Sequence, residues 1–189
     1  MEPARKLDEQ YTYADYSSWP EDERWELIDG AAYALATPTR AHQSTLLEIA
    51  RQIGNFLRGK PCQVFVAPFS VRLNADEGDD TVVEPDILVV CDEKKLADGK
   101  GVVGAPDLIV EVLSPSTAKH DRLTKFALYQ RSGVREYWIV DPDISTVTVN
   151  ILFHDIGYVS RAYGEGDTAM PVEVLEGCTI NLADVFDGL

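Results

Sequence analysis

The chain has 189 residues, of which 45% are hydrophobic, so it can bury a sizeable core within one domain of ordinary length. Its 32 Asp and Glu residues outnumber 17 Lys and Arg, and the resulting net charge of −15 repels phosphate backbones over most of the surface. This excludes a broadly basic nucleic-acid-binding protein, so any nucleic-acid site must be local. We predict an N-terminal tail over residues 1–12 and a single domain over residues 13–189.

The cysteine spacing and the N-terminal sequence indicate the cellular compartment of the protein. Cys62, Cys91 and Cys178 lie far apart in sequence, without a CxxC pair or a histidine at metal-ligand spacing, so we expect reduced thiols. The N-terminus lacks an apolar signal core, and no apolar run approaches the length of about 20 residues that spans a bilayer. These features predict a cytoplasmic protein without a membrane segment.

The first part of the chain predicts a β-hairpin and a long helix. Two half-apolar runs in residues 24–36 meet at an Asp-Gly dipeptide, which favours a tight turn. Residues 37–59 carry apolar side chains at helical spacing, with Thr37 and Thr39 as capping residues and a glycine at the end. His42 lies on this apolar stripe.

The rest of the chain alternates strands and one more helix. The expected strands are 62–73, 81–91, 108–113 and 136–142, the expected helix is 118–132, and residues 146–167 predict an antiparallel hairpin. The strand, helix, strand order over residues 108–142 predicts a parallel crossover. We therefore predict an α/β fold, with a mixed central sheet flanked by helices, an N-terminal hairpin and a C-terminal β extension.

Two carboxylates occur inside these apolar strands. Side chains alternate faces along a strand, so Glu84 and Asp86 share one face of the expected strand 81–91, while Glu111 is in the middle of a run that is otherwise typical of a buried strand. If the strands are neighbours, Asp86 and Glu111 converge, and such a pair needs a proton or a divalent cation between its members. The alternative is that Asp86 ends a turn and Glu111 pairs with a basic residue.

Several motifs resemble the Uma2 family of restriction-endonuclease-like proteins. They are "ELIDG", "VEPDILVV", "PDLIVEVLSPST", "DRLTKFALY" and "GVREYWIVDP", in the expected order over nearly the whole chain. The resemblance implies the PD-(D/E)xK nuclease fold and a Mg²⁺ (or Mn²⁺) site. Asp86 matches its first acid and Glu111 its second, and the main-chain carbonyl of Val112 is the third metal ligand that the resemblance implies.

The lysine of that motif is missing. Leu113 stands two residues beyond Glu111, where the lysine is expected, whereas Lys125 lies on the following helix with Asp121 and Tyr129 four residues to either side. Some members of the wider superfamily carry the lysine on this helix, so Lys125 is our candidate for the catalytic cation. The alternative is an exposed ion pair between Asp121 and Lys125, worth about 0.2–0.5 kcal/mol.

Other polar residues receive structural interpretations. We expect His42 to be a hydrogen-bonded packing residue, although it could reach the site. Glu84 is either an accessory residue of the site, as Asp121 and Tyr129 could be, or a solvated residue near the strand entrance. The serines and threonine of the "SPST" stretch, Ser114, Ser116 and Thr117, are expected to cap a helix rather than act as nucleophiles. A GxGxxG pattern at residues 99–104 precedes a strand, so its context does not fit phosphate binding.

These features support one main functional hypothesis and two alternatives. The first is a Mg²⁺-dependent endonuclease that hydrolyses nucleic acid, for which a local basic site is not evident and a homodimer is compatible. The second is a binding or regulatory module that kept the nuclease fold and lost efficient chemistry, in line with Leu113 and the net charge of −15. A two-carboxylate glycosidase ranks last, since no aromatic sugar platform is visible.

Overall fold

The computed structural model describes residues 9–20, 23–97, 99–114, 118–164 and 166–188. Its largest element is a six-stranded mixed sheet in the order β11-β10-β9-β8-β6-β3, in which β8 and β9 are parallel and the other neighbours antiparallel. The strands are β3 (Gln63–Val66), β6 (Ile87–Val90), β8 (Leu108–Val112), β9 (Glu136–Asp141), β10 (Thr146–Phe153) and β11 (Gly157–Tyr163).

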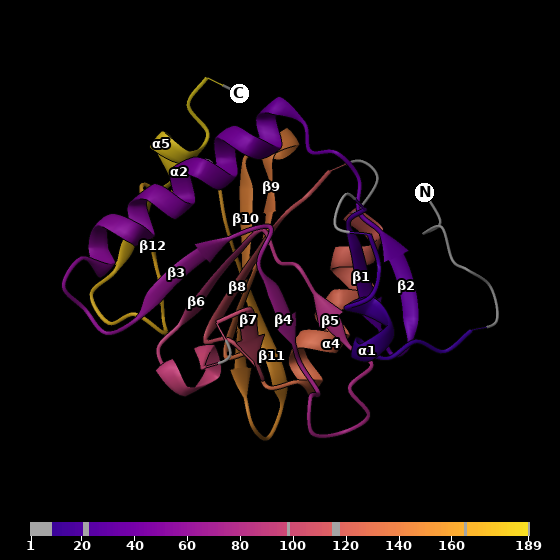
Figure 1. Cartoon of the computed structure of the whole chain (residues 1–189). Coiled ribbons are helices and arrows are strands. Elements are labelled where there is room, and N and C mark those ends of the chain that lie inside the picture. The colour runs from indigo at the N-terminus through magenta and orange to yellow at the C-terminus, as the bar shows by residue number, and fades with distance from the viewer. Residues whose placement is uncertain (1–8, 21–22, 98, 115–117, 165, 189) are drawn as a thin grey trace.

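A second sheet of five strands lies beside the first (Figure 1), in the order β2-β1-β5-β4-β7. Its strands are β1 (Trp25–Ile28), β2 (Ala31–Ala34), β4 (Ser70–Arg72), β5 (Val82–Val83) and β7 (Gly101–Val103). The predicted β1–β2 hairpin turns at Asp29 and Gly30, whose φ angles of 50° and 75° are those of the tight turn that an Asp-Gly dipeptide favours.

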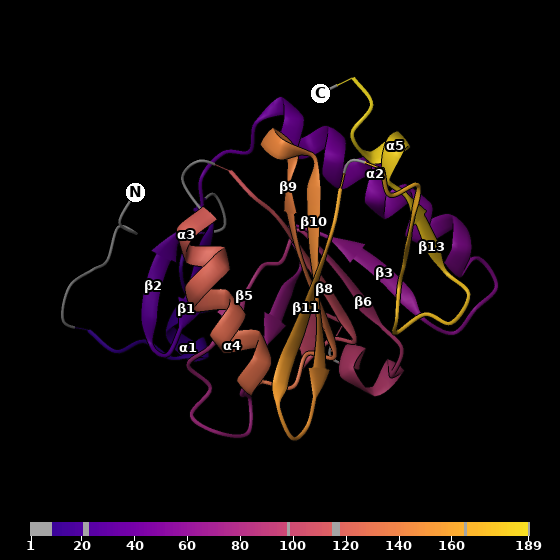
Figure 2. The same cartoon turned by 180° about the vertical axis from the view of Figure 1, so that it is seen from behind.

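The helices cover the two faces of the six-stranded sheet. Apolar side chains of α2 and the C-terminal segment pack on one face, and those of the helix after β8 and of the second sheet pack on the other. Figure 2 shows from behind that α2 and α4 lie on opposite sides of this sheet. The remaining elements are α1 (Tyr13–Tyr16), α2 (Arg40–Leu57), α3 (Ala118–His120), a π-helical turn (Asp121–Lys125), α4 (Phe126–Arg131), β12 (Ala169–Pro171), β13 (Thr179–Asn181), α5 (Leu182–Val185) and two 3₁₀ turns (Glu93–Leu96 and Pro142–Ile144).

The mixed α/β architecture and its parallel crossover agree with the prediction, but two predicted strands do not. Residues 62–73 and 81–91 each divide at a proline, and the two halves of each belong to different sheets. Proline lacks the N–H that a continuous ladder requires, and a run of β-forming residues on either side of it hides the break. Glu84 and Asp86 therefore do not share one strand face, because they lie in the connection between β5 and β6.

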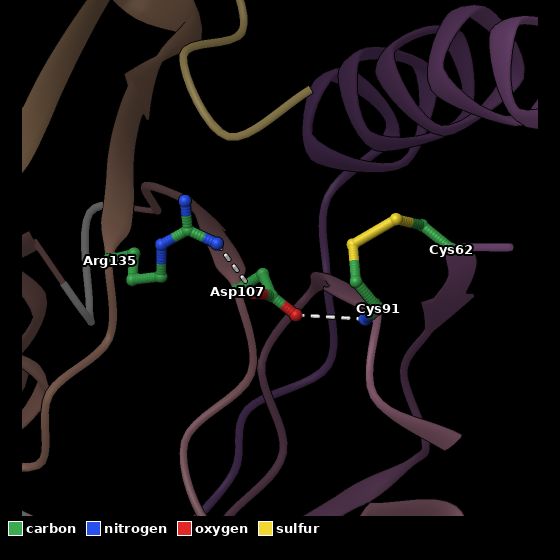
Figure 3. The surroundings of a disulfide bond; sticks show 4 residues. All are labelled: Cys62, Cys91, Asp107 and Arg135. Carbon is green, nitrogen blue, oxygen red and sulfur yellow. Dashed lines mark hydrogen bonds and ion pairs between the residues drawn. A yellow bond between two sulfur atoms is a disulfide. The ribbon is translucent and has the colours of Figure 1, made fainter. Parts of the chain in front are cut away.

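The expectation of three reduced cysteines is wrong for two of them. Cys62 and Cys91 form a disulfide (Figure 3). Cys178 is free and buried. Gln63 pairs with Val90 in the antiparallel β3–β6 ladder, so the two cysteines follow at the next opposed position. Sequence separation alone could not show this, because the pairing depends on the strand register.

The β6 end of this bridge is also held by polar contacts. The Cys91 N–H donates to Asp107 Oδ2 at 2.8 Å, and Arg135 pairs with the other oxygen of the same carboxylate at 3.0 Å (Figure 3).

In the part of the chain that the structure describes, no helix is long and apolar enough to cross a membrane.

Candidate active site

The register of β6 and β8 brings the two predicted acids together. Ile87 lies opposite Val110 at the end of the antiparallel ladder, so Asp86 and Glu111 occupy the next opposed positions. Asp86 Oδ2 accepts a hydrogen bond from the Val112 N–H at 2.8 Å, which fixes the first carboxylate against the strand that carries the second. The two strands are neighbours, as their convergence requires.

Glu111 pairs with a lysine and a tyrosine from the following helix. Its side chain points into the protein and the residue is only 4% exposed. Its Oε1 lies 2.8 Å from Lys125 Nζ and accepts a hydrogen bond from the Tyr129 hydroxyl at 2.7 Å. A buried carboxylate without partners costs several kcal/mol, so these contacts explain how an acid is tolerated in this strand.

The helix turns an unexpected face toward the sheet. Asp121, Lys125 and Tyr129 are buried, whereas Leu123 is 62% exposed and Ala127 is also exposed. Regular helical spacing predicts an apolar stripe of Leu123, Phe126 and Ala127, with Lys125 and Tyr129 at its border. This prediction is wrong for Leu123 and Ala127, and only Phe126 of the three packs against the core. Residues 121–125 form a π-helical turn, which changes the angular spacing of side chains and cannot be read from a regular helical period.

A third acid, Glu26 of β1, also contacts Lys125, and the sequence analysis missed it. Its Oε1 lies 2.9 Å from Lys125 Nζ and accepts a hydrogen bond from the Glu84 N–H at 2.9 Å. Glu26 is 1% exposed. Its signal in the sequence was a charged residue at an inward position of an apolar strand, which is the signal that identified Glu111.

The buried acids around Lys125 determine the charges at the site. Burial alone would lower the pKa of Lys125, but the carboxylates of Glu111, Glu26 and Asp121 together raise it well above its usual value, so the ammonium stays charged. For Glu111, burial raises the pKa, and the neighbouring acids add to this against the opposing effect of Lys125. The net effect is a raised pKa, so the carboxyl of Glu111 is harder to ionise than an exposed glutamic acid.

His42 and Glu84 complete the surroundings of Asp86. His42 Nε2 lies 3.1 Å from Asp86 Oδ2, and the histidine is 8% exposed at the start of α2. It is a hydrogen-bonded packing residue, as expected, and its partner is a site acid. Glu84 pairs with Arg24 at 2.8 Å and its side chain is 11% exposed, so the expectation of a solvated Glu84 is wrong.

Comparison with known proteins places this geometry in a family. The family model Uma2, described as "Putative restriction endonuclease", matches residues 13–183. The chain belongs to the Uma2 family. Two uncharacterized proteins of Synechocystis sp. (strain ATCC 27184 / PCC 6803 / Kazusa), slr1290 and sll1609, are each 28% identical to it, over 143 and 134 residues. These matches cover 74% and 69% of this chain, and 72% and 74% of the relatives.

A solved structure shares the fold of this Uma2 chain. It is described as a "putative nuclease belonging to DUF820" from Anabaena variabilis ATCC 29413, and it superposes with a TM-score of 0.76 at 20% sequence identity. The match covers 93% of this chain and 97% of the other. The restriction-endonuclease-like fold that the resemblance implied is therefore confirmed.

The two candidate metal ligands line a cleft of about 410 Å³ between α2, the start of β6 and the helix after β8. Asp86, Glu111 and Lys125 lie along it together with Ser114. Ser116 and Thr117 are expected to cap the same helix as Ser114, and they lie outside the residues that the structure describes. Of the two threonines expected to cap α2, Thr39 does so and Thr37 lines the cleft.

The residues of the cleft fit a hard divalent cation in part. Within the described residues, no group of three or more His, Cys, Asp or Glu side chains is arranged as a complete metal site. Mg²⁺ does not require such a cage, because it is usually bound by one or two carboxylates and several waters. Asp86 and Glu111 supply this minimal set of oxygen donors, and both lie on the cleft that also includes Val112.

Proposed function

We propose that this Uma2 protein is a metal-dependent endonuclease that hydrolyses phosphodiester bonds of nucleic acid. Asp86, Glu111 and the main-chain carbonyl of Val112 would hold Mg²⁺ or Mn²⁺. The observation that carries the proposal is the distance of 2.8 Å between Lys125 Nζ and Glu111 Oε1 in the cleft. The usual position of the motif lysine holds Leu113 in this chain, and this short distance supports Lys125 in the role of that lysine.

Each side chain has a distinct role in this proposal. A bound divalent cation would lower the pKa of a water and neutralise charge on a phosphate oxygen. Lys125 would orient the attacking water or stabilise developing negative charge with its ammonium. The Tyr129 hydroxyl holds Glu111 in orientation, and the Val112 N–H and His42 do the same for Asp86.

The test is cleavage of labelled DNA and RNA, single- and double-stranded, by purified protein with Mg²⁺ or Mn²⁺. We expect cleavage that is lost with EDTA and in Glu111→Ala. The control Asp141→Asn removes a carboxylate that pairs with Arg122 on the surface and should keep full activity. Cleavage that persists in Glu111→Ala, or no cleavage of any substrate by the wild-type protein, would refute the proposal.

A second candidate is a regulatory module that uses the same fold without catalysis. Two observations favour it: Lys125 is already paired with several acids, and the net charge of −15 opposes binding of phosphate backbones. Absence of divalent-cation binding at millimolar concentration would support this module over the enzyme.

A further inference from the structure

Two exposed apolar side chains lie among the residues that line the cleft. Leu47 of α2 is 68% exposed and Val66 at the end of β3 is 42% exposed, and both line the cleft. Leu35, Pro38 and Ala67 continue this lining. An exposed cluster of this kind, next to buried acids, indicates a surface that receives an apolar part of a ligand.

The candidate catalytic groups are much less exposed than these two side chains. Glu111 and Lys125 are each 4% exposed, and the whole cleft measures about 410 Å³. A volume of this order takes a ligand of a few hundred Å³, roughly the size of a drug-like molecule. A phosphate must enter the cleft to meet these groups, which a strand can do more easily when it is separated from its complement.

Few cationic side chains line the described part of the cleft, so a nucleic acid must be held there mainly by contacts other than those to its backbone. A protein that grips duplex DNA through its backbone neutralises several phosphates with Lys and Arg. The cationic side chains among the described lining residues are Arg24, which pairs with Glu84, and Lys125, which is buried among acids. The lining therefore offers apolar contact rather than a track of positive charge.

We propose that the cleft takes unpaired nucleotides of a single-stranded nucleic acid, with base faces against Leu47 and Val66 and a phosphate at the divalent cation that Asp86 and Glu111 would hold. This inference rests on the proposed function for the placement of the phosphate. Apolar side chains such as leucine contact base faces once bases are unstacked, and these faces are hidden in a duplex. DNA and RNA strands share this chemistry, and they form separate arms of the test.

The experiment measures binding by fluorescence anisotropy, with labelled 12-nucleotide single strands of DNA and RNA and the matching duplexes, in Ca²⁺. We expect a single strand to bind at least about tenfold more tightly than its duplex. Leu47→Ser and Val66→Ser should each weaken that binding at least about threefold. The control Leu123→Ser changes a leucine that is 62% exposed on the helix outside the cleft, and it should bind like the wild type.

Equal or tighter binding of duplex, no binding of any probe, or equal effects of Leu47→Ser and Leu123→Ser would overturn the inference. A parallel cleavage assay in Mn²⁺ separates it from the proposed function. Binding of single strands without cleavage would support this inference and contradict the proposed nuclease function. Cleavage with a preference for duplex would support the nuclease function and contradict this inference.

Discussion

Lys125 and Glu111 form a buried ion pair between a helix and a strand, with 2.8 Å between Nζ and Oε1 and a side-chain exposure of 5% for each. Glu26 contacts the same ammonium at 2.9 Å from a strand of the other sheet. The lysine thus links its helix to one strand of each sheet and places a positive charge 2.8 Å from one of the proposed metal ligands.

Replacement of Lys125 by methionine keeps most of the side-chain stem and removes the charge. Glu111, Glu26 and Asp121 would then be buried without their shared cation, which costs about 3–5 kcal/mol of unfolding free energy. On the proposed mechanism, turnover should also fall at least about tenfold, or roughly 1.4 kcal/mol of transition-state stabilisation. Urea unfolding and single-turnover cleavage measure the two effects.

Two further variants separate charge from packing. The double variant Lys125→Met with Glu26→Gln removes one of the carboxylates that Lys125→Met leaves without a cation. It should therefore recover part of the lost stability but none of the activity. Arg122→Met breaks an exposed pair with Asp141, and should change stability by less than about 1 kcal/mol. If Lys125→Met proved no less stable than Arg122→Met, the buried pair would have no energetic role.

Binding of a divalent cation should strengthen as the pH rises toward the raised pKa of Glu111. Burial and the neighbouring acids raise the pKa of Glu111, so a proton competes with the cation for this carboxylate. Calorimetry in buffers of different ionisation enthalpy should show proton release on Mn²⁺ binding. An affinity that does not increase with pH would contradict the raised pKa.

The raised pKa of Glu111 also predicts how Glu111→Gln alters the free energy of unfolding at different pH values. A carboxyl whose folded pKa lies above its unfolded value stabilises the fold while it is protonated, and this stability is lost as the pH rises through the folded pKa. Glutamine imitates the protonated form and does not titrate. The stability of the wild type relative to Glu111→Gln should therefore fall as the pH increases above about 4.5. Parallel stability curves from urea titrations at several pH values would contradict this expectation.

The disulfide between Cys62 and Cys91 closes a loop with a sequence separation of 29 residues. Loop entropy predicts that the double variant Cys62→Ser, Cys91→Ser loses about 3–4 kcal/mol of unfolding free energy. Dithiothreitol should destabilise the wild type by a similar amount and leave the double variant unchanged. The buried thiol of Cys178 offers a control, because Cys178→Ala should keep its sensitivity to the reductant. A wild type insensitive to dithiothreitol would argue against the bridge.

Local sequence patterns predicted several of the elements and the neighbouring positions of Asp86 and Glu111. The Asp-Gly turn, the long helix and the β8–β9 crossover each depend on signals within a few residues. Asp86 and Glu111 could be identified because a charged residue inside an apolar strand requires a partner.

Features that depend on tertiary contacts were missed or misjudged. The inward face of the helix after β8 follows from a π-helical turn, so regular spacing selected Leu123 where the fold buries Lys125. The proline breaks assign strand halves to different sheets, and this places Glu84 beside Arg24 rather than in solvent. Glu26 joins the site only because β1 of the second sheet lies against the helix that carries Lys125.

Calorimetric titration with Mn²⁺ tests the central claim most directly, because it asks whether Asp86 and Glu111 form a metal site without requiring a known substrate. We predict one binding event in the wild type and in Asp141→Asn, and its loss in Asp86→Asn and in Glu111→Gln, with all proteins folded by circular dichroism. Equal binding by Asp86→Asn and the wild type, or no binding by the wild type at millimolar Mn²⁺, would contradict the account.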